Sequence, residues 1–257
     1  MLKICILASS SAGNAVFIAS GRTRLLIDAG LSRREIAKRL AAIGEDIGAL
    51  DAVLVTHEHT DHTCGLNALS KAAERPLPVY LTRGTARFIE WDGCVPVLEE
   101  FQAGCSFTIG DFDIASFTIP HDAMDPVGYT LTSEGIKIAI ATDLGYITQN
   151  IPDKLQDATV VLLEANHDLE MLRVGPYPWS VKQRVMSRRG HLSNDVAGEF
   201  IKAHLGYVHR LILGHISEHN NHPELVRNMG LKALNGRTLF TDLVVAEPGV
   251  QSEVFCY

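Results

Sequence analysis

The sequence has 257 residues, of which 46% are hydrophobic and 21% charged, and its formal net charge is −7. This composition is that of an ordinary globular protein, and the length is sufficient to bury a sizeable core without disulfides. Because phosphate neutralisation supplies most non-specific affinity for nucleic acids, the acidic balance excludes binding through an overall positive surface. Any contact with nucleic acid must therefore be local.

The cysteines and the apolar segments indicate in which cellular compartment the protein is expected. The five cysteines are Cys5, Cys64, Cys94, Cys105 and Cys256. An odd number without any C-x-x-C pair predicts neither a disulfide framework nor a thiolate zinc site. No apolar stretch approaches the roughly 20 residues that a membrane-spanning helix needs, and the apolar start of the chain leads into strand-like alternation rather than a processing site. We therefore expect a soluble, cytoplasmic protein with no membrane contact.

The predicted elements are short strands interleaved with helices. Strands are expected over residues 2–7, 15–19, 24–27 and 53–55, in several β-periodic segments between 107 and 141, and over 160–163 and 211–213. Helices are expected over 32–43, with Ser32 and Glu35 as a capping box, and over 194–204 and 223–234. Two batches of strands without a repeat or long linker predict a single α+β domain over residues 1–257, built as a four-layer αββα sandwich.

The strongest functional signal directly follows the strand at 53–55. The chain there reads Thr56-His57-Glu58-His59-Thr60-Asp61-His62. So many imidazoles and carboxylates beside a core are costly unless they bind something. In an irregular loop alternate side chains diverge, so His57 and His59 can serve one ion while Asp61 and His62 serve another. Glu58 and Thr60 are expected to shape the turn or to support the ligands.

Further ligands are expected from other strand ends. His121, Asp143 and His215 each directly follow an apolar strand, which brings them to one rim of the fold. His219 is the rival for the place of His215. One zinc ion takes about four ligands, so this many candidates predict two ions. Imidazoles with carboxylates suit Zn²⁺ or Mn²⁺ and fit calcium poorly. We therefore expect two divalent metal ions per chain, Zn²⁺ or Mn²⁺.

In order and spacing, these segments resemble the metal motifs of the metallo-β-lactamase superfamily. The resemblance implies that His57, His59 and His121 hold the first ion, that Asp61, His62 and His215 hold the second, and that Asp143 bridges them. It also implies that a hydroxide between the two ions is the nucleophile.

A carboxylate and a histidine further along the chain narrow the reaction class. Glu164 ends an apolar strand and His191 precedes a helix, and they resemble the pair that phosphodiesterase branches such as ribonuclease Z place beside the metals. A carboxylate-paired histidine stays protonated near neutral pH and can protonate a leaving alkoxide. The predicted catalytic residues are thus Asp61, Glu164 and His191. The alternative, in which His191 only flanks a helix start, stays open.

Within the superfamily, the chain is most similar to the exonuclease-like YycJ (WalJ) group. The similarity is carried by Ser9-Ser10-Ser11-Ala12-Gly13-Asn14, Leu26-Ile27-Asp28-Ala29-Gly30, His121-Asp122-Ala123, Glu164-Ala165-Asn166-His167-Asp168, Gly190-His191-Leu192-Ser193-Asn194 and His215-Ile216-Ser217-Glu218-His219-Asn220-Asn221. It implies a phosphodiesterase or nuclease of exonuclease type, with nucleic acid as the partner and DNA expected in preference to RNA.

Five residues are predicted to contact the substrate: Ser10, Asn14, Tyr177, Lys182 and Arg184. The first two lie in the opening turn, and the last three in a basic strip over residues 177–189 that leads into His191. Such a strip could hold phosphates and stack a base, although a solvated helix face has the same pattern.

Two other functions remain compatible with the sequence. The same metals could hydrolyse a small ester, lactone or thioester, which the acidic net charge favours. Alternatively, the metals could only tie loops together in a regulatory scaffold, although a purely structural zinc site is normally closed by four ligands and needs no second ion. The sequence leaves open the native metal, the choice among DNA, RNA and small-molecule substrates, the exo or endo mode and its polarity, and the oligomeric state. It also leaves open whether Glu164 and His191 pair.

Overall fold

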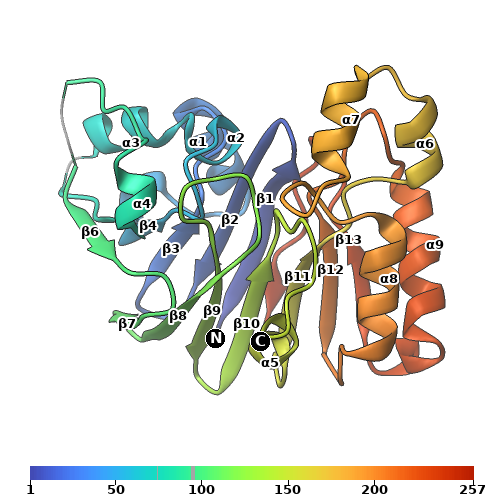
Figure 1. Ribbon diagram of the computed structural model, residues 1–257. Coiled ribbons are helices and arrows are strands. Elements are labelled where there is room, and N and C mark those ends of the chain that lie inside the picture. Colours follow the sequence, from blue (N-terminus) through green and yellow to red (C-terminus); the bar gives the residue numbers. More distant parts are fainter. Residues whose placement is uncertain (74, 94–95) are drawn as a thin grey trace.

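The computed structural model describes residues 1–73, 75–93 and 96–257, and two sheets run through it (Figure 1). The strand order of the first sheet is β14 (Phe255–Cys256), β1 (Lys3–Ser10), β2 (Gly13–Ala19), β3 (Arg24–Ile27), β4 (Ala52–Leu54), β5 (Val79–Thr82), β6 (Leu98–Phe101). The order of the second is β13 (Asp242–Val245), β12 (Arg210–Gly214), β11 (Val160–Glu164), β10 (Ile136–Ala141), β9 (Val127–Ser133), β8 (Phe112–Thr118), β7 (Ser106–Ile109).

Each sheet is antiparallel in one part and parallel in the other. In the first sheet β1, β2 and β3 pair antiparallel, and β3 to β6 continue in parallel. In the second sheet β7 to β10 pair antiparallel, and β10 to β13 continue in parallel. The carboxyl ends of parallel neighbours lie at one edge of a sheet, so polar residues that follow these strands are brought together.

Alternation along the strands separates the core into three layers. In β11, Val160 and Leu162 face the apolar layer between the two sheets, whereas Val161 and Leu163 face the layer under the helices of the second sheet. In β1, Cys5 belongs instead to the layer under the helices of the first sheet. Successive side chains of a strand point to opposite faces, so wholly apolar strands are required here.

Helices cover both outer faces. On the first sheet lie α1 (Arg33–Ala42), η1 (Ile47–Ala49), α3 (Leu66–Ala72) and α4 (Arg83–Ala86), and on the second lie α5 (Ile151–Leu155), α8 (Asn194–Ala203) and α9 (Pro223–Leu234). The remaining helices are α2 (Thr60–Thr63), α6 (Leu169–Val174), α7 (Trp179–Val185) and η2 (Arg237–Leu239). The architecture is the predicted αββα sandwich, and every strand and helix expected from the sequence is present.

Two local predictions need correction. Ser32 does cap α1, because its hydroxyl accepts a hydrogen bond from the backbone N–H of Glu35 at 3.3 Å. The Glu35 carboxylate, however, accepts from Arg39 Nε at 2.8 Å, so the returning half of the capping box is absent. The metal motif is an irregular loop only as far as His59, because Thr60–Thr63 form α2. In the first case the Arg39 side chain, one helical turn away, binds the Glu35 carboxylate in place of the capping contact. In the second case a short helix begins inside the metal motif, where the sequence predicted an irregular loop.

Cysteines and helix lengths agree with the sequence analysis over the described residues. Cys5, Cys64, Cys105 and Cys256 are free thiols, and Cys94 lies outside the residues that the structure describes. Within the described ranges, no helix has both the length and the apolar character needed to cross a bilayer.

Gly30 is required where the loop after β3 passes under the metal motif. A Cβ atom on Gly30 would lie 1.7 Å from the Asp61 carbonyl oxygen and 2.6 Å from the Asn14 nitrogen, and both are backbone atoms that cannot rotate away. We predict that Gly30→Ala lowers the free energy of unfolding by about 1–3 kcal/mol, the usual cost of overpacking. Urea unfolding would measure this change.

The matched control is Gly21→Ala, because a Cβ atom on Gly21 meets nothing within 4 Å. Its free energy of unfolding should stay within about 0.5 kcal/mol of the parent value. Equal stability of the two variants would show that residue 30 tolerates a side chain and that the loop shifts freely.

Candidate metal centre

Five polar residues end strands, or follow them within three residues, at one rim of the sandwich. Asp28 and His57 follow β3 and β4 of the first sheet, and Asp143, Glu164 and His215 lie at the ends of β10, β11 and β12 of the second. Three of these residues have left-handed backbones, with φ of 61° at Asp28, 60° at Asp143 and 54° at His215. Such conformations are costly outside glycine and cluster at functional sites, where the surrounding structure enforces them.

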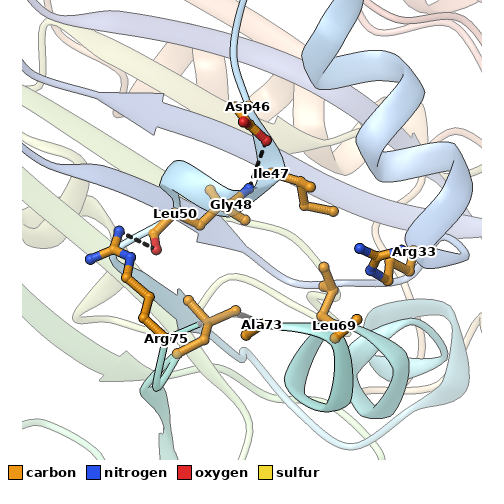
Figure 2. A pocket seen from close by; sticks show the side chains of 10 residues that line it. Arg33, Asp46, Ile47, Gly48, Leu50, Leu69, Ala73 and Arg75 are labelled. Carbon is orange, nitrogen blue, oxygen red and sulfur yellow. Dashed lines mark hydrogen bonds between the residues drawn. The ribbon is translucent and has the colours of Figure 1, made fainter.

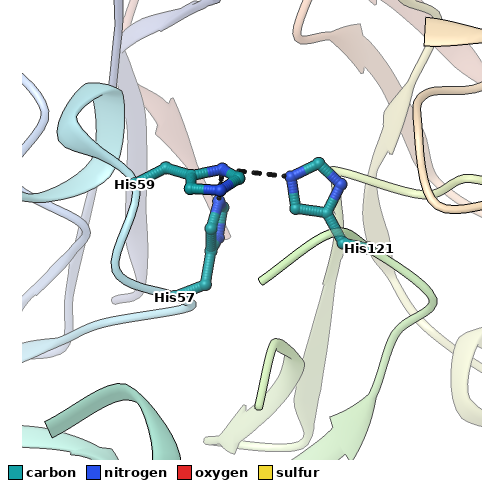
Figure 3. Close-up of side chains that lie close together, drawn as sticks. All are labelled: His57, His59 and His121. Atoms are coloured by element: carbon teal, nitrogen blue, oxygen red, sulfur yellow. Dashed lines mark hydrogen bonds between the residues drawn. The ribbon is translucent and has the colours of Figure 1, made fainter. Parts of the chain in front are cut away.

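One group of imidazoles comes from two distant segments. His57 Nε2 and His121 Nε2 lie 3.1 and 3.2 Å from His59 Nδ1 (Figure 3). His57 is fully buried and His121 nearly so, and the ring of His59 is T-shaped to the other two, with interplanar angles of 79° and 73°. Nitrogen atoms that converge in this way can all donate lone pairs to one ion. These are the three residues expected to hold the first ion.

Asp143 lies at the centre of a second group. Its Oδ1 is 3.3 Å from His215 Nε2 and 3.8 Å from His121 Nε2, and its Oδ2 is 3.5 Å from His62 Nε2. Asp61 is at the margin of this group, with Oδ2 3.4 Å from His62 Nε2. Asp143 therefore contacts histidines from both expected ion sites, which is the position required of a bridging ligand.

The outward nitrogens of the histidines fix which nitrogen faces the centre. His121 Nδ1–H donates to the Gly190 carbonyl at 3.2 Å, and His62 Nδ1–H donates to Asp28 Oδ2 at 2.8 Å. His57 Nδ1 lies 3.0 Å from the Thr56 hydroxyl. A partner on Nδ1 orients the ring and leaves Nε2 for a metal. The donor set thus fits divalent ions of the zinc or manganese class.

Burial and charge also fit a metal site. Asp143 Oδ2 is buried and lacks a hydrogen-bond partner within the part of the chain described. Burial alone would raise the pKa of Asp143, but His215 and His62 hold it well below its usual range, so the carboxylate is ionised. Burial, aided by His62, keeps the pKa of His57 low and its ring neutral. An ionised carboxylate and a neutral imidazole are the forms that bind metals.

His62 behaves differently from His57. Burial would lower the pKa of His62, but the carboxylates of Asp143 and Asp28 outweigh it and raise that pKa well above its usual value. A metal ion that binds the His62 ring must therefore displace a proton from it, so metal binding should strengthen as the pH rises.

Glu164 and His191 form a pair beside Asp143. Glu164 is fully buried, and its Oε1 accepts from His191 Nδ1 at 2.7 Å. Glu164 Oε2 accepts from the backbone N–H groups of Leu144 and Leu192 at 2.7 and 3.1 Å, so the carboxylate is held in place. His191 Nδ1 is 3.9 Å from Asp143 Oδ1. The two residues therefore form the pair that the resemblance implies, a contact that the sequence alone left open, and the histidine adjoins the ligand group.

Asp28 is a site residue that the sequence analysis quoted but did not assign. Its Oδ1 accepts from the Thr56 backbone N–H at 2.8 Å, and its Oδ2 accepts from the Thr56 hydroxyl at 2.9 Å as well as from His62. It thereby sets the orientation of His62 and of the start of the motif. The signal was present, because Asp28 directly follows an apolar strand just as Asp143 and His215 do.

The opening turn reaches the ligands, although it was expected to contact substrate. Asn14 Nδ2 lies 3.3 Å from Asp61 Oδ2 and 3.1 Å from His62 Nε2, and its Oδ1 accepts from His215 Nδ1 at 3.2 Å. Ser10 is buried, and its hydroxyl accepts from the Ala12 N–H at 3.2 Å. Asn14 thus positions expected ligands, and a substrate contact by either residue stays a prediction.

In the basic strip over residues 177–189, some of the cationic side chains already have partners within the protein. Lys182 is 8% exposed, and its Nζ donates to the Arg173 carbonyl at 2.7 Å. The Arg184 guanidinium is paired with Asp122. Tyr177 is half-buried and contacts His219, which lies outside the ligand groups. The cations of α7 are therefore already engaged by the protein, and their role in substrate binding stays a prediction.

A separate cavity of about 180 Å³ lies between α1, η1 and α3 (Figure 2). Asp46 caps η1 by accepting from the Gly48 N–H at 2.9 Å, and Arg75 Nη2 donates to the Leu50 carbonyl at 2.9 Å. These polar groups stabilise the loop that carries them. We assign the cavity no chemistry.

The sandwich with this donor set at its rim defines a metal-dependent hydrolase. Residues 23–216 match the family model described as the beta-lactamase superfamily domain, so the chain belongs to the metallo-β-lactamase superfamily.

Within this superfamily, the chain is similar over most of its length to two proteins named as exodeoxyribonucleases. It is 36% identical over 254 residues to the exodeoxyribonuclease WalJ of Streptococcus pneumoniae, covering 96% of this chain and 90% of that protein. It is 36% identical over 230 residues to the exodeoxyribonuclease YycJ of Bacillus anthracis, covering 88% and 86%. The fold matches that of the metallo-β-lactamase fold protein YhfI from Bacillus subtilis with a TM-score of 0.73 at 18% identity, covering 98% and 100%.

The Glu164 carboxylate should control the protonation of His191. Burial disfavours the imidazolium, but Glu164 outweighs it and raises the pKa of His191 to about 9, so the ring is protonated at pH 7 and loses its proton as the pH rises through 9. In Glu164→Gln this charge is gone, while burial and the carboxylates of Asp143 and Asp122 remain, and we predict that the pKa of His191 falls below its value in the parent protein. Proton NMR titration of the chelator-treated protein would measure it.

The control is Glu170→Gln, which makes the same chemical change at an exposed residue of α6 whose partner is Arg173. The His191 titration should be the same in this variant as in the parent. A His191 pKa near the ordinary value in the parent, or no shift in Glu164→Gln, would contradict the charge coupling of the pair.

Proposed function

We propose that this protein is a metal-dependent exodeoxyribonuclease. The observation that carries the proposal is the Glu164–His191 pair next to Asp143, because phosphodiester cleavage needs an acid beside the metals more than lactam or ester hydrolysis does. The names of the relatives WalJ and YycJ support the same substrate class.

The ligand assignment belongs to this proposal. His57, His59 and His121 would hold one ion, Asp61, His62 and His215 the other, and Asp143 both. Two divalent ions, Zn²⁺ or Mn²⁺, would polarise the phosphodiester and supply an activated water for in-line attack. Asp28 and Asn14 keep the imidazoles of His62 and His215 oriented.

His191 is the proposed acid. Its side chain is 19% exposed, so it can meet a substrate, whereas Glu164 is fully buried behind it. As an imidazolium it would stabilise charge that develops on the phosphoryl group and would donate its proton to the departing 3′- or 5′-oxygen. Glu164, held by two backbone N–H groups, would keep the ring oriented and would favour its protonated form until the proton is transferred.

We further propose that the enzyme acts in the cytoplasm. Support comes from the thiols of Cys64, Cys105 and Cys256, which are exposed and free in the structure. Proteins of reducing compartments keep such thiols unpaired.

Removing a ligand of one ion site should distinguish the two sites. We predict that His59→Ala reduces the metal content from about two ions per chain to about one, and that it lowers phosphodiesterase activity about a hundredfold or more. Inductively coupled plasma mass spectrometry and hydrolysis of bis(p-nitrophenyl) phosphate on the same sample would measure both. His219→Ala is the matched control, because this histidine lies outside the ligand groups. Unchanged metal content in His59→Ala would contradict the assignment.

The substrate class can be tested by comparing DNA, RNA, lactone and thioester substrates. We predict that the metal-loaded protein shortens a single-stranded oligodeoxynucleotide from one end and cleaves the matching oligoribonucleotide at least about tenfold more slowly, a modest difference in transition-state binding of about 1.4 kcal/mol. Electrophoresis of end-labelled strands would resolve the products. Hydrolysis of lactones or thioesters alone would favour the small-ester function, and a metal-replete protein without any hydrolysis would favour the scaffold.

A further inference from the structure

A groove of about 440 Å³ opens beside the ligand groups. It is lined by residues 118–121, by residues 123–126, and by Tyr146, Arg188 and Arg189. His121 belongs both to this lining and to the imidazole group of Figure 3. We call this feature the Tyr146 groove. Whatever occupies it lies directly next to the reacting centre.

The loop that carries the two arginines is held against the metal centre by backbone contacts. The Gly190 carbonyl accepts from His121 Nδ1 at 3.2 Å. Gly145 packs on the same loop so closely that a Cβ atom there would lie 2.3 Å from the Arg188 carbonyl oxygen. The backbone of Arg188 and Arg189 therefore has a fixed position relative to His121 and to the segment that follows Asp143.

The two arginines are exposed cations without a partner carboxylate. Over the described residues, no carboxylate oxygen lies within 4.0 Å of a side-chain nitrogen of Arg188 or Arg189, whereas Arg184 is paired with Asp122. Asp125 also lines the groove and offsets part of the positive charge. In a chain of net charge −7, this is a local cationic edge beside the site.

An aromatic ring accompanies the charge. The Arg188 guanidinium lies 4.2 Å from the centroid of the Tyr146 ring, which holds both groups in one stacked unit. Proteins that bind single-stranded nucleic acid combine cations for the backbone with aromatic rings for the bases. The Tyr146 groove supplies both, next to His121.

We propose that the Tyr146 groove binds the nucleotide adjoining the scissile phosphate of a single DNA strand, with its phosphate at Arg188 and Arg189 and its base against the Tyr146–Arg188 unit. This inference rests on the proposed nuclease function and names where that function holds its substrate. Recognition of this kind is independent of base sequence, because every base has a face that stacks and every nucleotide carries a phosphate.

The test compares a short single-stranded oligodeoxynucleotide with bis(p-nitrophenyl) phosphate, which has a single phosphate and no nucleotide beside it. In Arg188→Ala/Arg189→Ala, kcat/KM for the oligonucleotide relative to that for the small ester should fall about tenfold or more, through KM. The slope of log KM against log salt concentration should become less steep by about 0.7 for each phosphate that the protein no longer neutralises. The control Arg227→Ala/Lys232→Ala removes the same charge from α9 and should leave the ratio of the two kcat/KM values unchanged.

Tyr146 is tested separately from charge. Tyr146→Leu should raise KM for the oligonucleotide about tenfold, and Tyr146→Phe should keep it within about twofold, because stacking needs the ring and not the hydroxyl. On an oligonucleotide with abasic residues the effect of Tyr146→Leu should disappear.

The experiments distinguish an error in the groove proposal from an error in the proposed nuclease function. If the parent protein cleaves both substrates and the arginine variant keeps the same kcat/KM ratio and salt slope as the α9 control, the groove is not the binding site although the nuclease stands. If the parent cleaves neither substrate with Zn²⁺ or Mn²⁺, the proposed function fails and the groove proposal falls with it.

Discussion

One buried carboxylate organises the rim of this protein. Asp143 is 1% exposed, has a left-handed backbone, and keeps one oxygen without a hydrogen-bond partner in the described part of the chain. An ionised carboxylate is costly to bury unless cations or donors surround it. His62, His121 and His215, from three separate segments, each place Nε2 within 3.8 Å of it. The groups that compensate the carboxylate are thus those that can hold metal ions.

Much of the fold and most of the candidate ligands could be predicted from the sequence for the same reason. A polar residue that directly follows a wholly apolar strand lies at a sheet edge whatever the loops do, which brings His57, Asp143 and His215 to the rim. Asp28 obeys this rule as well and was not assigned. Its contact with His62 spans 34 residues, and an aspartate after a short strand is equally typical of an ordinary turn.

The remaining features depend on contacts that spacing along the chain does not encode. The run of cations in α7 is visible in the sequence, but the pairing of Arg184 with Asp122 spans 62 residues, and the Lys182 ammonium is tied to a carbonyl of the preceding helix. Among the residues that the structure describes, the cationic side chains of this strip without an ion-pair or hydrogen-bond partner are those of Arg188 and Arg189, a few residues further on. Which members of a charged strip are free is decided by tertiary packing, and a linear pattern gives them equal weight.

The loop at residues 187–190 then connects parts of the site that the strands leave separate. Its end holds His121 through the Gly190 carbonyl, and the next residue is His191, whose partner Glu164 also binds the backbone of Leu144. His191, the imidazole group and the cationic edge are therefore joined by one continuous backbone segment. The net charge of −7 gives the protein no overall attraction for phosphate, so the positive charge of Arg188 and Arg189 acts locally at that edge.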